Sequence, residues 1–202
     1  FINNEDIHTS TAARVFNINI NEVNEEQRRN AKIVNFGIIY GVSAFGLSNQ
    51  TNLTRGESKE IIDNYFKSYP KLKEYMSNQI SYARENGYVE TILKRKRYLP
   101  EINSRNAILR SSAERNAINT PVQGSAADII KLAMIKIDSE IEKKSLKSKL
   151  ILQVHDELVF DVHLPELNIV KEIVSYNMEN AIQIDVPLKV DIGYGDNWLV
   201  AH

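Results

Sequence analysis

The sequence has 202 residues, of which 43% are hydrophobic and 25% charged, with a net charge of −1 and no cysteine. This composition is typical of a globular protein with a full core, and it excludes a disulfide scaffold and a thiolate metal site. No apolar run of about 18 residues predicts a membrane span, and no signal-peptide pattern is recognised. The sequence starts at Phe1, not Met, so we expect a fragment of a longer protein.

The first half of the sequence is predicted to be helical. Asn24 is followed by Glu26 and Gln27, a pattern typical of a helix start with a side-chain cap and an acid in the first turn. Pro70 marks a break, and Gly87 stands where a left-handed residue ends a helix. The elements expected here are helices over 9–16, 24–40, 54–69 and 71–86, and a turn with a short helix over 43–53.

The second half mixes helices with short strands. Residues 88–93 and 97–99 are expected to pair as a hairpin around a basic turn at 94–96. Because Pro121 cannot donate a backbone hydrogen bond, we expect one helix to end before it and another to begin after it. Residues 149–162 have the apolar pattern of two strands joined by a tight turn. The remaining expected elements are helices over 106–119, 123–145 and 165–182, and a strand over 187–193, which makes the fold class α+β.

Charge is unevenly distributed along the chain. Residues 91–115 contain seven Lys or Arg against two Glu, a net charge of +5. Residues 138–202 contain six Lys against twelve Asp or Glu, a net charge of −6. A basic band and an acidic region can hold phosphates and metal ions respectively, and chance scatter of charge is the alternative.

Four residues spaced four apart are the most informative pattern. Arg28, Lys32, Phe36 and Tyr40 share one face of the helix predicted over 24–40, because a helix turns once every 3.6 residues. Two cations followed by two flat rings suit a nucleotide, with its phosphates at the basic end and its base against the rings. The alternative is an ordinary amphipathic helix whose aromatic end is buried.

A run of polar residues lies between the two strands predicted over 149–162. His155, Asp156 and Glu157 form this turn, although β-propensity disfavours acids. Adjacent carboxylates suit a hard cation such as Mg²⁺, but a two-metal site needs at least one further carboxylate from elsewhere. Solvation of a hairpin tip explains the same residues without a metal.

A second polar series consists of Arg115, Asn119 and Gln123. Their donors suit phosphate oxygens or acceptors in a DNA minor groove, and ordinary polar surface is the alternative. Pro121 interrupts the series, so the three are not certain to share one face. His8, far upstream, is ambiguous, because a lone histidine is more often structural or solvated than functional.

Together these segments resemble the family A DNA polymerases of the bacterial type. The resemblance rests on four collinear motifs and extends over essentially the whole chain. The motifs are DIHTSTAARVF (6–16), RRNAKIVNFGIIYG (28–41), AERNAINTPVQGSAADIIK (113–131) and QVHDE (153–157).

The resemblance implies a fold and a set of nucleotide contacts. Residues 1–104 would form a helical fingers subdomain, and residues 105–202 the C-terminal part of a palm subdomain with the metal-site hairpin at 149–162. The implied dNTP-binding residues are His8, Arg28, Lys32, Phe36 and Tyr40. Among these, Lys32 would also be catalytic, because it could protonate the departing pyrophosphate.

The resemblance also implies metal and DNA contacts. Asp156 would ligate two catalytic Mg²⁺ ions, with Glu157 supporting the site. The implied DNA-binding residues are Arg115, Asn119, Gln123 and His155.

The implied function is template-directed DNA synthesis from dNTPs, in DNA replication and repair. We expect the parent protein to be a DNA-directed DNA polymerase, a nucleotidyltransferase that acts on primer–template DNA as a monomer. A cytoplasmic location is expected, with an organelle as the alternative. The family's first palm motif, which carries another metal-binding Asp, lies upstream of residue 6, so we expect this piece alone to be inactive. The alternative is a non-catalytic nucleotide- or DNA-binding module.

Overall fold

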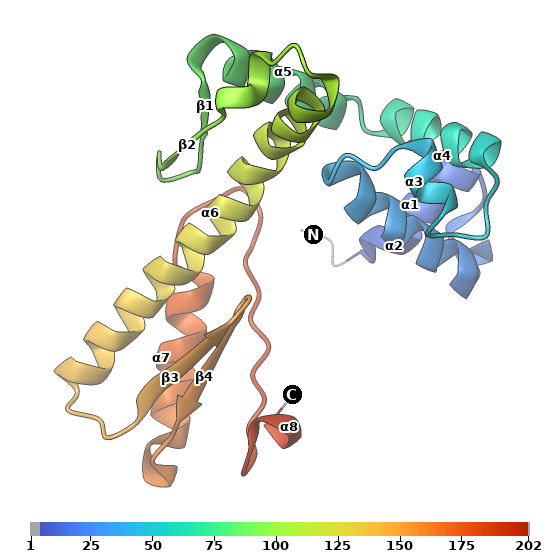
Figure 1. Cartoon of the computed structure of the whole chain (residues 1–202). Helices are drawn as coiled ribbons and strands as arrows, with labels where there is room; N and C mark the ends of the chain where they lie inside the picture. Colours follow the sequence, from blue (N-terminus) through green and yellow to red (C-terminus); the bar gives the residue numbers. More distant parts are fainter. Residues whose placement is uncertain (1–4, 202) are drawn as a thin grey trace. The chain divides into compact units, whose positions relative to one another are not determined.

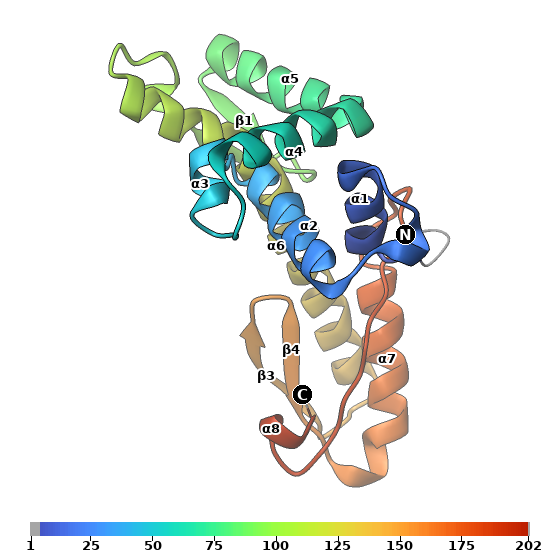
Figure 2. The same cartoon turned by 90° about the vertical axis from the view of Figure 1, so that its right-hand side faces the viewer.

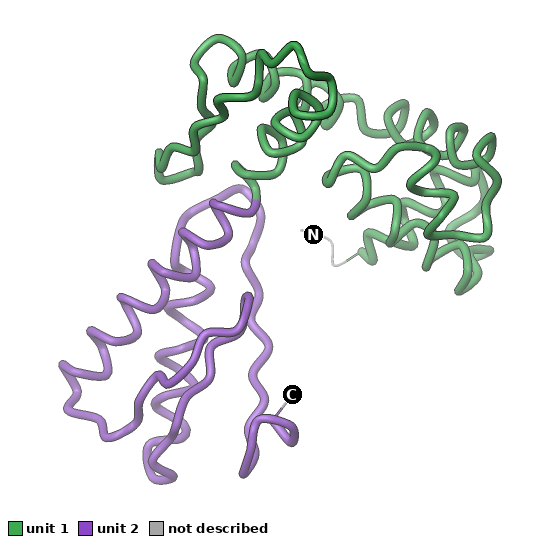
Figure 3. Tube along the Cα trace, in the orientation of Figure 1, with its two compact units in different colours: residues 1–122 green, residues 123–202 purple. Residues whose placement is uncertain are grey.

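The computed structural model of this chain describes residues 5–201 (Figure 1). Phe1 and His202, which entered the sequence-based expectations, lie outside the described residues. The chain divides into two compact units, residues 1–122 and 123–202 (Figure 3). Helices build most of the first unit, and the second unit combines helices with a two-stranded antiparallel sheet. The predicted α+β class is confirmed.

The first unit follows the predicted helices closely. Its helices are α1 (Ile7–Phe16), α2 (Glu25–Ile39), α3 (Ala44–Ser48), α4 (Arg55–Ser68) and α5 (Pro70–Asn86), and its 3-10 turns are η1 (Ile20–Glu22) and η2 (Pro100–Asn103). Side chains cap the first turn of four of these α-helices, each worth about 1 kcal/mol. The caps are Asp6, Asn24, Ser43 and Thr54.

Helices α1 to α4 share one core, in which α1 lies along α2 (Figure 2). Helix α2 buries Ala31, Val34 and Ile38, which are spaced three and four apart and therefore lie on one face. Val34 and Ile38 pack with Leu47 and Ile61, from α3 and α4. The opposite face of α2 is therefore left outside this core.

The predicted basic hairpin is confirmed with shorter strands. Strands β1 (Tyr88–Glu90) and β2 (Lys96–Tyr98) pair antiparallel, and Lys94 in the turn between them has a left-handed φ of 63°. A small core lies beside the hairpin; its buried residues are Ala83, Val89, Leu99, Ile102, Ala113 and Ala117.

The expectation of two helices separated at Pro121 is wrong. One continuous helix, α6 (Ala107–Lys143), contains Pro121 and belongs to both units. A proline inside a helix removes one hydrogen bond and adds a local clash. Buried residues hold the helix on both sides of it, Ala117 in the first unit and Ala133 in the second. This anchoring explains why the helix continues through a residue that disfavours it. None of the helices among the described residues, α6 included, is long and apolar enough to cross a membrane.

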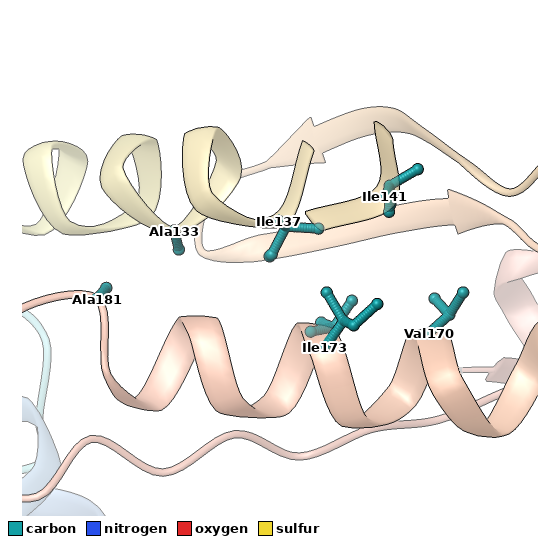
Figure 4. Packing of buried hydrophobic residues seen from close by; sticks show 7 residues of the cluster. Ala133, Ile137, Ile141, Val170, Ile173 and Ala181 are labelled. Carbon is teal, nitrogen blue, oxygen red and sulfur yellow. The ribbon is translucent and has the colours of Figure 1, made fainter. Parts of the chain in front are cut away.

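The second unit packs α7 (Leu167–Glu179) against the last turns of α6. Ala133, Ile137 and Ile141 face Val170 and Ile173 in this core (Figure 4). Strands β3 (Lys149–Val154) and β4 (Glu157–Asp161) form the predicted hairpin, with an irregularity in register at Leu150–Leu152. A 3-10 turn, η3 (Leu164–Glu166), precedes α7, and a short helix, α8 (Trp198–Ala201), lies near the end of the chain.

The strand expected over 187–193 is not formed. This segment belongs to no ladder, and each sheet of the described chain has two strands, β1 with β2 and β3 with β4. Extended, apolar-rich sequence becomes a strand only when a neighbour completes its backbone hydrogen bonds, and Pro187 lacks a donor of its own.

Candidate nucleotide-binding helix and metal-site hairpin

The four-residue series on α2 lies on the exposed face of that helix. Arg28, Lys32, Phe36 and Tyr40 are all exposed, and the two aromatic rings are 50% and 48% accessible. The alternative in which the aromatic end of the helix is buried is therefore wrong. Two large aromatic side chains half open to solvent form an apolar surface beside fixed cations, which suits a planar ligand that carries negative charge.

A groove runs along this face. Its volume is about 540 Å³, and Lys32, Phe36 and Tyr40 contribute to its walls. The other lining residues are Arg29, Ile33, Gly37, Val42 and Gln50. Gly37 lets the chain after α2 come close, because a Cβ on it would lie 2.9 Å from Cγ1 of Val42.

The basic end of the series carries an ion pair. Arg28 Nε donates a hydrogen bond to Asp6 Oδ2 at 2.8 Å, and Asp6 Oδ1 accepts from the backbone N–H groups of His8 and Thr9. The hydrogen bond from Arg28 is the main reason that the pKa of Asp6 falls to about 2. Asp6 therefore joins the start of α1 to the basic end of α2.

Helix α1 places His8 beside the series. The His8 and Phe36 rings lie with their centroids 5.8 Å apart, and His8 Nδ1 is 3.0 Å from Asn35 Nδ2. Burial lowers the pKa of His8, and the nearby positive charges of Arg28 and Lys32 lower it further, against the opposing effect of Asp6. The structure thus groups His8 with Arg28, Lys32 and Phe36.

Sequence reasoning missed Asp6 and Asn35 as parts of this group. The signal for Asp6 is its position two residues before a helical His, where an acid caps the first turn. The signal for Asn35 is a polar residue on the inward face of α2, between Val34 and Ile38. A buried amide needs hydrogen-bond partners, but nothing in the sequence identifies them.

The second polar series lies on the continuous helix α6, which keeps the helical spacing of Arg115, Asn119 and Gln123 unbroken. Arg115 and Gln123 are exposed, and Asn119 is partly buried. Arg115 Nη1 donates to Ser111 Oγ at 3.1 Å. Its aliphatic stem packs against Gly41, where a Cβ would lie only 2.8 Å from Arg115 Cγ. Arg115 therefore lies close to the end of α2, directly after Tyr40.

The hairpin tip places two carboxylates next to each other. His155 and Asp156 form a two-residue loop, since Val154 pairs with Glu157. His155 has a left-handed φ of 53°, and Gln153 Nε2 donates to its carbonyl oxygen at 3.0 Å. Asp156 is exposed, and Glu157 is partly buried at the start of β4.

The donors at this tip are of the type that Mg²⁺ prefers, since both are carboxylates. Residues 5–201 contain no cluster of three or more His, Cys, Asp or Glu that could enclose a metal. Asp156 and Glu157 supply two carboxylates of the kind that Mg²⁺ takes, and an enclosed site needs further ligands.

Comparison with known proteins identifies the family. The model described as "DNA polymerase family A" matches residues 1–200, and the chain belongs to that family. The sequence is 52% identical to DNA polymerase I of Caldicellulosiruptor bescii over 98% of this chain, and 50% identical to DNA polymerase I of Bacillus subtilis over 98%. These matches cover 23% and 22% of the two relatives, so the chain spans about a quarter of their length.

A solved structure is similar over nearly the whole chain. It is the POL domain of Pol1 from M. smegmatis, in a complex with DNA primer-template and dNTP. The TM-score is 0.93 at 44% identity, and the match covers 98% of this chain and 35% of that domain.

Proposed function

We propose that this chain provides the nucleotide-binding helix and part of the metal site of a DNA-directed DNA polymerase, which extends a primer along a DNA template with dNTPs. The observation that carries the proposal is the exposed series on α2, in which Arg28, Lys32, Phe36 and Tyr40 lie on one face. Membership in DNA polymerase family A supports the reaction, and the similar POL domain supports the ligands.

In this proposal each residue of α2 contacts a different part of the dNTP. Arg28 and Lys32 bind the triphosphate, assisted by His8, and Phe36 stacks on the base or sugar. Tyr40 stacks near the template base and restricts access to the insertion site. Lys32 also gives a proton to the departing pyrophosphate, because its ammonium group can be held against the oxygens where negative charge develops.

The remaining residues act on metal and DNA. Asp156 and Glu157 would hold Mg²⁺, which when bound would neutralise charge on the reacting phosphates. His155 lies at the primer terminus. The donors that would contact the duplex backbone and minor groove are Arg115, Asn119 and Gln123.

We assign residues 1–104 to a fingers subdomain and residues 105–202 to the later part of a palm subdomain. The parent protein would act as a monomer in the cytoplasm, or in an organelle. The bacterial DNA polymerase I relatives support a bacterial-type enzyme.

A chimera tests the proposed reaction. The 202 residues replace the matching segment of Bacillus subtilis DNA polymerase I, and primer extension is measured with Mg²⁺ and all four dNTPs. We expect extension by the chimera and its loss in Asp156→Ala. Asp161→Ala is the matched control, because Asp161 is an exposed carboxylate in the same hairpin, at the far end of β4. Equal activity in both variants would exclude the proposed role of Asp156.

Titration of the 202-residue chain with dATP separates a polymerase segment from the other candidate, a non-catalytic nucleotide-binding module. Binding that is lost in Lys32→Ala and kept in Lys59→Ala, an exposed lysine on α4, supports the site on α2. A chimera that binds dATP through Lys32 but extends no primer would favour the binding module.

A further inference from the structure

A chain of hydrogen bonds leads from His8 into the core of the first unit. Asn35 Nδ2 lies 3.0 Å from His8 Nδ1, and Asn35 Oδ1 accepts a hydrogen bond from Thr11 Oγ1 at 3.1 Å. Thr11 Oγ1 is in turn 3.1 Å from the hydroxyl of Tyr69. Asn35 is 8% exposed and Thr11 is fully buried, so water does not replace these partners easily.

The placement of the Asn35 amide, with its oxygen at Thr11 and its nitrogen at His8, sets the direction of every bond. The hydroxyl of Thr11 has one proton, which it donates to Asn35 Oδ1, so the bond between Thr11 and Tyr69 is donated by Tyr69. An amide nitrogen only donates, so His8 Nδ1 accepts from Asn35 Nδ2. A neutral imidazole that accepts at Nδ1 carries its proton on Nε2. Nε2 of His8 makes no hydrogen bond within residues 5–201.

We propose that Asn35, oriented by Thr11 and Tyr69, is a positioning residue that holds His8 as a neutral imidazole with its proton on Nε2, where it donates to a phosphate oxygen of the nucleotide. The identity of this ligand rests on the proposed function. The tautomer of His8 does not, because the hydrogen bonds that select it are present in the chain without ligand.

Protonation of His8 would break this arrangement. A proton on Nδ1 would face the Asn35 amide group, which is also a donor. Rotation of the amide would relieve that conflict, but its nitrogen would then donate to Thr11, and the Thr11 hydroxyl would have to turn its proton toward Tyr69. Charging His8 therefore requires Asn35, Thr11 and Tyr69 to reorient together, and the Tyr69 hydroxyl proton loses Thr11 as its acceptor.

The charges around His8 also favour the neutral imidazole. Arg28 and Lys32 face it from α2 and disfavour a third positive charge, while Asp6 at the start of α1 opposes them. Asp6 is itself paired with Arg28 at 2.8 Å, which reduces its attraction for a charged imidazole. His8 therefore contributes a directional hydrogen bond to the phosphates, whereas Arg28 and Lys32 contribute the charge.

Nitrogen-15 NMR of the histidine rings in the 202-residue chain tests the tautomer directly, without nucleotide. The His8 resonances are assigned by their loss in His8→Gln. We expect a pyridine-type Nδ1 and a pyrrole-type Nε2 in the unmodified chain. A predominant proton on Nδ1, or a charged ring at neutral pH, would overturn the proposal.

Two variants at Thr11 form a matched pair. Thr11→Ser keeps the hydroxyl and should keep the Nε2–H tautomer. Thr11→Val has nearly the same shape but no donor, so the Asn35 amide is free to turn its oxygen toward His8, and we expect a mixture of tautomers and a raised pKa of His8. Identical His8 spectra in the two variants would show that Thr11 does not orient Asn35.

Asn35→Asp reverses the polarity at the same place. A carboxylate accepts from Nδ1–H, so we expect the proton to move to Nδ1 and the pKa of His8 to rise. Should this buried acid prevent folding, the two Thr11 variants still test whether Asn35 is oriented by Thr11.

The dATP dissociation constant is measured for Thr11→Val and Thr11→Ser. We expect about 3- to 10-fold weaker binding for the valine variant only, which corresponds to the loss of roughly one hydrogen bond. Altered tautomer with equal dATP binding would remove the phosphate contact from the proposal. Absence of dATP binding in every form, with the expected spectra, would contradict the proposed function and leave the positioning role intact.

Discussion

Replacement of Phe36 or of Ile38 by alanine, two residues apart on α2, should affect stability and nucleotide binding in opposite order. Phe36 is 50% exposed, whereas Ile38 is 2% exposed in the core that joins α2 to α3 and α4. Complete burial of such a side chain stabilises a protein by about 1.5–3 kcal/mol, so Phe36→Ala should lower the free energy of unfolding by only about 1 kcal/mol. Ile38→Ala leaves a cavity and should cost about 2–5 kcal/mol.

Nucleotide binding should show the reverse order. Stacking of a base on an aromatic ring contributes about 1–3 kcal/mol to binding. Phe36→Ala should therefore have a roughly 5- to 150-fold larger dissociation constant for dATP. Ile38 does not line the groove on α2. Ile38→Ala should therefore bind dATP normally at a temperature where it remains folded.

Urea unfolding followed by circular dichroism and calorimetric titration with dATP measure the two effects on the same samples. Phe45→Ala is the control, because Phe45 is a 61% exposed aromatic residue on α3 that does not line the groove, and it should change neither quantity appreciably. The assignment of Phe36 to the nucleotide would be refuted by unchanged dATP binding in Phe36→Ala, or by equal weakening in Phe45→Ala.

Two further predictions concern stability. The pKa of Asp6 is about 2 in the folded chain and 3.8 in its ordinary state, so its contribution to the free energy of unfolding is complete above about pH 4 and is lost as the pH falls toward 2. Asp6→Asn should therefore reduce the loss of stability at acid pH, as measured by urea unfolding at several pH values. The effect should be less than about 1 kcal/mol, because the pair with Arg28 is nearly half exposed. Gly41 and Gly87 both have left-handed φ angles, of 76° and 77°, so alanine should cost about 1–2 kcal/mol at each. Gly41→Ala should cost more than Gly87→Ala, because only at Gly41 does the new Cβ meet a neighbour, Arg115 Cγ at 2.8 Å; equal unfolding midpoints would exclude that packing.

The sequence by itself determined the local elements and the series on α2. Asn24, followed by acid in the first turn, marks the start of α2, and the spacing of four between Arg28 and Tyr40 places both on one face of any regular helix. Gly87 likewise marks the end of α5. These signals depend on residues within a few positions of one another, so they can be recognised without a tertiary structure.

Tertiary structure decided the backbone conformation of segments in which local preference and packing disagree. Pro121 predicts a break, but buried residues on both sides of it keep α6 continuous. Residues 187–193 have the composition of a strand, but strand formation depends on a hydrogen-bonded neighbour, which the segment itself does not specify.

The surroundings of His8 also required the folded chain. Whether its aromatic neighbour Phe36 would be buried or exposed could not be read from periodicity, because an amphipathic pattern is compatible with either. The hydrogen-bond partner of His8 is Asn35, 27 positions away in the sequence, and Thr11 is hydrogen-bonded to Tyr69, 58 positions away. Hydrogen bonds between distant residues form only where packing brings α1, α2 and the end of α4 together, so the protonation state of this histidine is a property of the tertiary fold.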